Sequence, residues 1–154
     1  MDIVQKRINE WLGPKCDPQT QQEIRTLQKQ NPQALYDAFS CDLSFGTGGL
    51  RALMGPGTNR LNIYTIRKHT QALANYILKR GDRTKGVVIG FDSRNCSELF
   101  AKEAARVFAG NSIPVYFLSL IRPTPFISFV CRYKKCQAAV MITRSEEHTS
   151  ELLS

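Results

Sequence analysis

Apolar and polar positions form regular blocks in the second half of the chain. Three short runs are almost entirely apolar, at residues 87–91, 113–118 and 138–142. Runs of this kind are typical of strands that are buried on both faces of a sheet. Between them, apolar residues recur at helical spacing over residues 97–109 and 125–133. This alternation of strands and helices predicts three parallel strands that are joined by right-handed crossovers.

The N-terminal part of the chain carries its apolar side chains at helical spacing instead. Residues 2–12 predict one amphipathic helix, which ends at a glycine–proline pair. Two further helices are predicted to begin at Pro18 and Pro32, because proline suits the first position of a helix. We therefore expect a helical segment over residues 1–42, which contains no chemical motif.

A longer amphipathic pattern covers residues 65–80, with Gly81 as the predicted C-terminal cap. His69 lies at the edge of its apolar side and is predicted to be structural, because no catalytic partner accompanies it. The next helix is predicted to begin with a capping box formed by Asn95 and Glu98. The predicted buried face of the longer helix contains Ile66, Leu73, Tyr76 and Ile77.

Together these elements predict an α/β fold. A three-layer α/β/α domain with a mostly parallel sheet is expected over residues 43–143, preceded by the helical segment. In open parallel sheets, ligands bind beyond the carboxyl ends of the strands. Three polar segments follow those ends, at residues 92–94, 122–125 and 143–145. We expect the segments to meet at one edge of the sheet, although polar loops are common and the first segment could hold only a local ion pair.

Glycine is concentrated between the helical segment and the repeating pattern. Residues 45–57 contain five glycines and a proline, and Arg51 lies among them. Such a loop can turn its peptide N–H groups toward an anion, and a guanidinium suits phosphate. A tight turn between two strands, with Arg51 in solvent, explains the same pattern equally well. The spacing matches neither the dinucleotide-binding glycine motif nor the nucleotide P-loop.

The composition narrows the class of protein. The 154 residues are 42% hydrophobic and 22% charged, as in globular domains, and the net charge is +8. This charge favours an anionic ligand, but the basic residues are scattered and no nucleic-acid-binding motif is visible. The sequence has no signal segment at its start and no apolar run that could span a bilayer. We expect a cytoplasmic protein that binds neither nucleic acid nor membrane.

The cysteines support the same location. They are odd in number and irregularly spaced, and no second close pair or nearby histidine completes a zinc site. We therefore expect free thiols, as in a reducing compartment. The five residues are Cys16, Cys41, Cys96, Cys131 and Cys136.

Four motifs, taken together, resemble the first domain of the α-D-phosphohexomutase superfamily. They are Phe-Gly-Thr-Gly-Gly-Leu-Arg at residues 45–51, Gly-Phe-Asp-Ser-Arg at 90–94, Pro-Thr-Pro at 123–125 and Ala-Val-Met-Ile-Thr at 139–143. The N-terminal helices and residues 54–62 are similar to the phosphoglucomutase and phosphopentomutase-like branch. The resemblance implies phosphoryl transfer between two oxygens of a phosphorylated sugar, through a phosphoserine, a Mg²⁺ ion and a sugar 1,6-bisphosphate. Positioning and charge neutralisation carry such a transfer.

The resemblance also implies roles for particular residues. Ser145 stands at the phosphoserine position and would hold the metal through its phosphate, so Ser145 and Arg51 are the predicted catalytic residues. Asp92 would hold Arg94, and Arg94 would brace or contact the serine loop. The predicted phosphate-binding residues are Thr47, Gly48, Gly49, Arg51, Asp92 and Arg94.

The sequence departs from the family pattern after Thr143. Where the family has Thr-Ala-Ser-His-Asn-Pro, this chain has an arginine before Ser145 and two glutamates after it. Two carboxylates beside a phosphoserine would repel it and disturb its metal. Residues 144–154 are therefore expected to be a disordered, non-family tail, and resequencing of the gene would show whether they are native. The metal loop and the sugar-binding loops of the later domains are absent.

The leading prediction is the N-terminal domain of a phosphoglucomutase-like enzyme that interconverts hexose 1-phosphate and hexose 6-phosphate. As a fragment it is predicted to be inactive, and the missing C-terminal domains are its expected partners. The alternative is a non-catalytic module that binds a sugar phosphate, another anion or a partner protein. A weaker alternative, non-specific binding of nucleic acid, should show steep salt dependence.

Overall fold

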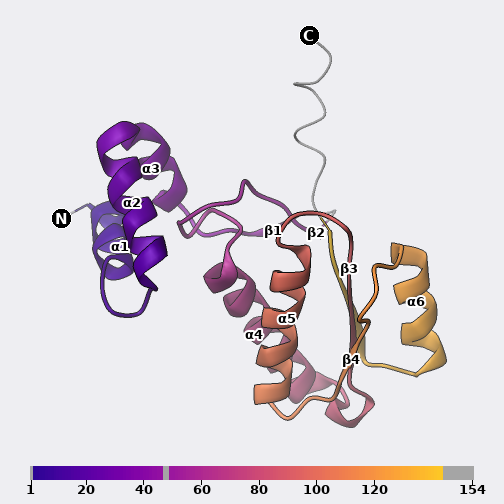
Figure 1. Ribbon diagram of the computed structural model, residues 1–154. Coiled ribbons are helices and arrows are strands. Elements are labelled where there is room, and N and C mark those ends of the chain that lie inside the picture. Colours follow the sequence, from indigo (N-terminus) through magenta and orange to yellow (C-terminus); the bar gives the residue numbers. More distant parts are fainter. Residues whose placement is uncertain (1, 47–48, 144–154) are drawn as a thin grey trace. The chain divides into compact units, whose positions relative to one another are not determined.

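The computed structural model describes residues 2–46 and 49–143 (Figure 1). By its internal contacts the chain divides into two compact units, Met1–Thr65 and Ile66–Ser154. The boundary falls inside helix α4 (Ile63–Arg80), so one helix belongs to both units.

Three helices build the core of the first unit, as the apolar spacing predicts. They are α1 (Ile3–Trp11), α2 (Pro18–Gln30) and α3 (Pro32–Phe39). The residue before each helix, an aspartate twice and an asparagine once, accepts a hydrogen bond from a backbone N–H of the first turn. Apolar side chains pack between the helices and are almost completely removed from water. These buried residues are Val4, Ile8, Ile24, Leu35, Ala38 and Phe39.

The glycine-rich segment forms a hairpin and then a closed loop. Strands β1 (Phe45–Gly46) and β2 (Gly49–Leu50) pair antiparallel, which confirms the two predicted strands, and the residues between them lie outside the described part of the chain. Further along, the side-chain amide of Asn62 donates to the carbonyl oxygens of Gly55 and Gly57, at 2.9 and 3.0 Å. The side-chain oxygen of Asn62 accepts two backbone N–H groups from the first turn of α4. One side chain therefore closes the loop and caps the helix that follows it.

A tyrosine at the start of α4 is tied to the start of α2. The hydroxyl of Tyr64 donates to Oδ2 of Asp17 at 2.6 Å, and the backbone N–H of Asp17 donates to the Tyr64 oxygen at 2.8 Å. Trp11 packs edge-on against the Tyr64 ring, with the ring centroids 5.2 Å apart, so it is a packing residue. The hydrogen bonds from Tyr64 and Thr20 lower the pKa of Asp17 from 3.8 to about 2.

We expect Tyr64→Phe to weaken the first unit and to reduce its resistance to acid. A carboxyl with a lowered pKa stabilises the fold above pH 3.8, and this contribution is lost as the pH falls through about 2. Removing the hydroxyl should therefore cost about 1 kcal/mol at neutral pH, after allowance for screening by solvent. Acid titration of the whole chain, followed by circular dichroism, would show unfolding at a higher pH. Tyr36→Phe, at an exposed position of α3, is the control, and equal acid midpoints for the two variants would contradict this account.

A parallel three-stranded sheet forms the centre of the second unit, in the order β4-β3-β5. The middle strand, β3 (Val87–Phe91), is buried at every residue, as its continuous apolar run predicts. It pairs in parallel with β4 (Val115–Phe117) on one side and with β5 (Ala138–Ile142) on the other. The carboxyl ends of β3 and β5 therefore meet at one edge of the sheet.

Two helices connect these strands and cover the sheet. Figure 1 shows α5 (Ser97–Gly110) and α6 (Thr124–Tyr133) on opposite sides of it. The second-unit part of α4 packs beside α5, where Nε of Arg67 lies 2.7 Å from Oε2 of Glu103. A short 3₁₀ helix, η1 (Arg83–Lys85), leads from α4 into the sheet. The layers of helix, sheet and helix confirm the predicted α/β class, and the N-terminal helices precede them as expected.

Two predictions about helices are wrong. The side chain of Tyr76 is 60% exposed, because the buried side of α4 turns toward Ala74, on the other flank of the apolar stripe. Asn95 and Glu98 do not form a capping box. Cys96 precedes α5 with a φ of 64° and no side-chain cap, and Glu98 instead forms an ion pair with a lysine one turn later.

The structure also bears on the predictions about the cysteines and about membrane-spanning helices. All five cysteines are free thiols, as expected. Within residues 2–46 and 49–143, none of the helices combines the length and the apolar character needed to cross a membrane. The predicted boundaries after residues 42 and 143 stay predictions, and the predicted disordered tail, 144–154, lies outside the described residues.

Candidate functional site

Polar side chains meet at the carboxyl ends of β3 and β5. The two strands are parallel and in register, so Phe91 lies opposite Ile142. The next residues, Asp92 and Thr143, are therefore neighbours in space although far apart in the sequence. The backbone N–H of Asp92 donates to the carbonyl oxygen of Ile142 at 3.2 Å, and the hydroxyl of Thr143 donates to Oδ2 of Asp92 at 2.6 Å. This pair forms the centre of the candidate site.

The Asp92 carboxylate gathers two more residues. Its Oδ1 accepts the hydroxyl of Ser97 at 2.7 Å and the backbone N–H of Arg94 at 3.1 Å. The guanidinium Nε of Arg94 lies 3.5 Å from Oδ2, and the Arg94 side chain is 42% exposed. The carboxylate therefore orients a guanidinium that an anion can still reach. Because both carboxylate oxygens are engaged, the arrangement is suited to positioning the chain rather than to proton transfer.

The predicted site residues fall in different parts of the structure. Asp92 and Arg94 are in direct contact in the second unit, as the sequence suggested. Gly49, at the start of β2 with a φ of 100°, and the exposed Arg51 belong to the first unit. The proposed phosphate-binding and catalytic roles of all these residues stay predictions. Thr47, Gly48 and Ser145 lie outside the described residues.

Two members of the Asp92 cluster are not among the predicted site residues. Ser97 is only 4% exposed and belongs to the first turn of α5. Its position shortly after the end of a buried strand is the sequence signal that indicates a site residue. Thr143 could be found from the parallel register of β3 and β5. In contrast, Arg122 of the polar segment after β4 lies over the ring of Phe126, with its guanidinium carbon 5.5 Å from the ring centroid.

We expect Asp92→Asn to destabilise the second unit by about 1–3 kcal/mol, because an amide cannot accept both hydroxyls and also pair with Arg94. Ser97→Ala removes one of these donors and should cost about 1 kcal/mol. Thermal unfolding of the whole chain would rank the two variants. Ser93→Ala, at an exposed position of the same turn, is the control. If Asp92→Asn and this control unfold at the same temperature, the carboxylate of Asp92 does not stabilise the ends of β3 and β5.

We also searched the described residues for side chains that could hold the predicted Mg²⁺ ion. They contain no group of three or more His, Cys, Asp or Glu side chains that could hold a metal ion. Mg²⁺ prefers an octahedral shell of oxygens, whereas both oxygens of Asp92 already bind hydroxyls and a guanidinium. The predicted contact of the ion with Ser145 lies outside the described residues.

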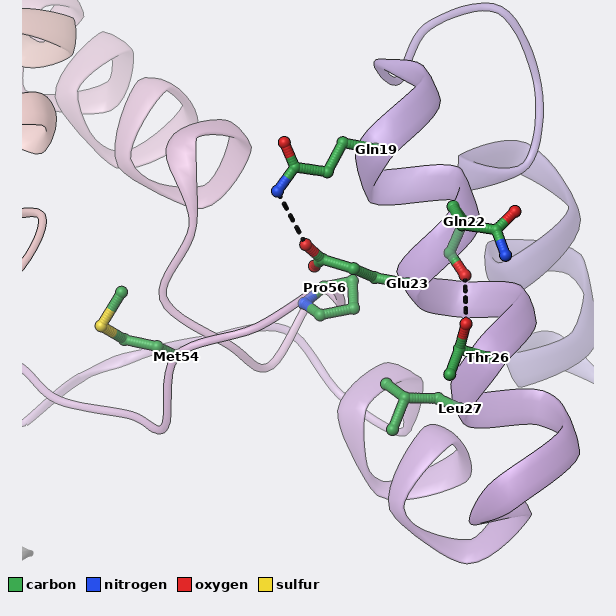
Figure 2. A pocket seen from close by; sticks show the side chains of 7 residues that line it. All are labelled: Gln19, Gln22, Glu23, Thr26, Leu27, Met54 and Pro56. Carbon is green, nitrogen blue, oxygen red and sulfur yellow. Dashed lines mark hydrogen bonds between the residues drawn. The ribbon is translucent and has the colours of Figure 1, made fainter.

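A separate groove lies along α2 in the first unit (Figure 2). Its volume is about 520 Å³, and it opens widely to solvent. Glu23 contributes a carboxylate to its wall, and Oε1 of Glu23 accepts the side-chain amide of Gln19 at 3.2 Å. A carboxylate repels a phosphate group, so this groove does not suit a sugar phosphate. The groove is lined by Gln19, Gln22, Glu23, Thr26, Leu27, Met54 and Pro56.

Comparison with known proteins identifies the class to which this fold and site belong. The family described as "Phosphoglucomutase/phosphomannomutase, alpha/beta/alpha domain I" matches residues 42–151. The chain therefore belongs to the α-D-phosphohexomutase superfamily, and it corresponds to the N-terminal domain of that superfamily.

Curated relatives of the chain are sugar phosphomutases and a bisphosphate synthase. The phosphopentomutase of Homo sapiens is 41% identical over 79% of this chain, and the glucose 1,6-bisphosphate synthase of Mus musculus is 33% identical over 94% of it. The phosphoglucomutase of Staphylococcus saprophyticus is 39% identical over 80% of the chain. The match covers only 21%, 25% and 21% of these three relatives, so the chain spans a quarter of their length or less. No solved structure gave a significant match.

Proposed function

We propose that this chain is the N-terminal part of a phosphoglucomutase-like enzyme, which interconverts hexose 1-phosphate and hexose 6-phosphate through a phosphoserine. The observation that carries the proposal is the Asp92 cluster, which anchors Thr143 two residues ahead of Ser145. The names of the relatives, which include a phosphoglucomutase, support a phosphorylated sugar as the substrate. Since other relatives are named phosphopentomutases, a pentose phosphate is the competing substrate.

In this proposal the described residues position the reacting groups. An in-line phosphoryl transfer requires the carrier oxygen to be held within a narrow range of positions, so a fixed lead into the Ser145 loop lowers the entropy cost of reaction. Asp92 provides this anchor. The exposed guanidinium of Arg94 would contact or brace the serine loop, and Arg51 would bind phosphate together with residues 47–49.

The proposed cofactors are Mg²⁺ and a sugar 1,6-bisphosphate, which acts as activator and intermediate. We assign the ion to the phosphate of Ser145, as the family resemblance implies, and to ligands from the rest of the protein. The missing C-terminal domains, proposed as partners, would also supply the sugar-binding loops. The net charge of +8 favours the approach of anionic substrates.

The 154-residue chain by itself is expected to be inactive. Without the domains that bind the sugar, the phosphoryl group and its acceptor oxygen are not held together, and the rate advantage of positioning is lost. The assay would supply Mg²⁺ and glucose 1,6-bisphosphate, with glucose 1-phosphate and ribose 1-phosphate as separate substrates. The phosphoglucomutase of Staphylococcus saprophyticus serves as the positive control. Magnesium-dependent conversion of either substrate by the purified chain would refute the prediction.

The second candidate is a non-catalytic module that binds a sugar phosphate. The half-exposed Arg94, held by Asp92 in a folded domain, is the observation that favours it. Calorimetry with glucose 1-phosphate should then show saturable binding that is lost in Arg94→Ala and kept in Arg80→Ala, an exposed control. Heat signals that do not saturate, or equal binding by both variants, would remove this candidate. Binding to nucleic acid with a steep salt dependence would instead support the weakest alternative.

We also propose a cytoplasmic location. The five free thiols support it, because reduced cysteines persist in reducing compartments. Fractionation of the source cells, followed by immunoblotting, would test this assignment, and recovery in a secreted fraction would contradict it.

A further inference from the structure

Two cysteines are brought together where α6 ends and the chain turns toward β5. The backbone N–H of Lys135, which has a φ of 54°, donates to the carbonyl oxygen of Arg132 at 3.1 Å. The backbone N–H of Cys136 donates to the carbonyl oxygen of Cys131 at 2.8 Å. These two nested hydrogen bonds define a Schellman motif, in which the side chains of the outer pair commonly contact each other. Here the outer pair consists of two thiols.

The side-chain contacts agree with this backbone geometry. The Sγ atom of Cys131 lies 3.8 Å from the carbonyl oxygen of Cys136. Both cysteines are half-buried, and burial together with the charge of the Cys131 thiolate raises the pKa of Cys136. A disulfide requires Cα atoms about 4.4–6.8 Å apart, and the hydrogen bond between the backbones of Cys131 and Cys136 favours a close approach of these two residues. The hydrogen-bonded turn therefore holds the two cysteines beside each other between α6 and β5.

We propose that Cys131 and Cys136 form an oxidisable dithiol, which closes into an intramolecular disulfide by exchange with a small-molecule disulfide of the glutathione type. The thiolate of one cysteine attacks the small disulfide, and the first small thiol leaves. The second cysteine attacks the resulting mixed disulfide, the protein S–S bond forms, and the second small thiol leaves. Two electrons pass from the cysteines to the small disulfide, and two protons end on the released thiols.

The other cysteines provide the contrast that makes this site specific. Cys16 is 8% exposed and lies in the first unit, whereas Cys41 and Cys96 are exposed. A small disulfide can modify an exposed single thiol, but the reaction then stops at the mixed disulfide. On the α6–β5 turn, a second thiol lies five residues from the first, within the same closed turn, and can displace the small thiol. This modification site does not depend on the proposed enzymatic function.

The experiment uses the 154-residue chain with Cys41→Ser and Cys96→Ser, so that three of its five cysteines remain. After treatment with oxidised glutathione, the intact mass should fall by about 2 Da, and no glutathione adduct should remain. The titratable thiols should fall from three to one under denaturing conditions, and dithiothreitol should reverse both changes. Trypsin, which cleaves after the basic residues between Cys131 and Cys136, should release two peptides that stay linked until reduction.

Adding Cys131→Ser or Cys136→Ser to this background should replace the mass loss with a stable mixed disulfide. A phenyl-substituted trivalent arsenical, which bridges two thiols, should bind one equivalent per background chain and none in either serine variant. Circular dichroism would establish that each variant is folded. The proposal is overturned if the background chain keeps three thiols, or if it ends as a mixed disulfide at Cys131 or Cys136.

Discussion

Replacing Gly57 with alanine is expected to unfold the first unit under conditions in which the parent chain stays folded. Gly57 has a φ of +133°, and a Cβ built on it would lie 2.5 Å from the carbonyl oxygen of Ala38. That carbonyl also accepts the backbone N–H of Asn59 at 2.9 Å, so α3 cannot move away without breaking this hydrogen bond. Backbone strain and the clash together should cost about 4 kcal/mol, which is a large share of the stability of a small domain.

Gly55→Ala is the matched control for this experiment. Gly55 has a φ of +144°, but a Cβ built there meets no atom within 4 Å, so it carries the strain without the clash. Its expected cost is about 1–2 kcal/mol. Urea unfolding followed by the fluorescence of Trp11, the single tryptophan, reports on the first unit. Equal losses for the two alanine variants would mean that the close approach of Gly57 to Ala38 does not contribute.

Arg67→Met is expected to destabilise the second unit by about 3 kcal/mol. The substitution removes one of the two arginines that neutralise the buried carboxylate of Glu103. The Glu103 side chain is 5% exposed and lies between Arg67 and Arg106, both of which pair with it. Burial raises the pKa of Glu103, but the hydrogen bonds and charges of the two arginines outweigh it, so the pKa lies below 4.5. The contribution of the cluster is therefore present above pH 4.5 and is lost as the pH falls.

Three comparisons test the account of this cluster. Arg67→Met/Glu103→Leu should regain most of the lost stability, since the buried charge and its partner are removed together. Lys102→Ala, which breaks the exposed pair with Glu98 on the same helix, should change the free energy of unfolding by no more than about 0.5 kcal/mol. The gap between the parent chain and Arg67→Met should narrow toward acid pH. A double variant as unstable as Arg67→Met at neutral pH would contradict the argument.

The strands and helices of the second unit could be predicted because buried positions are occupied by apolar residues, and the spacing of those residues differs between strands and helices. The five residues of β3 are buried on both faces, and an uninterrupted apolar run is the direct result. Once β3 and β5 are taken as parallel, the contact between Asp92 and Thr143 follows from register alone. The three N-terminal helices could be predicted from apolar residues at helical spacing and from the prolines at the first positions of α2 and α3.

Features that depend on three-dimensional packing could not be predicted in the same way. The exposed Tyr76 and the buried Ala74 flank the same apolar stripe of α4, and only the neighbouring helix decides which of them is covered. Cys96 adopts a left-handed conformation before α5, which is unusual for cysteine and has no sequence signal. The position of Ser97 after β3 is visible in the sequence, but its hydrogen bond to Asp92 crosses a turn whose shape depends on the conformation of Cys96.

The strand order β4-β3-β5 also has a consequence for the timing of folding. The middle strand, β3, cannot pair with β5 until residues 138–142 have been synthesised, because Val87 pairs with Ala138. The six buried residues between α1, α2 and α3, in contrast, have all been synthesised once the ribosome has passed Phe39. Contacts between residues that are far apart in the sequence form slowly. Until they form, an apolar strand without a partner can aggregate with other chains. During synthesis, β3 is therefore the segment most in need of chaperone protection, while the helices ahead of it can already be folded.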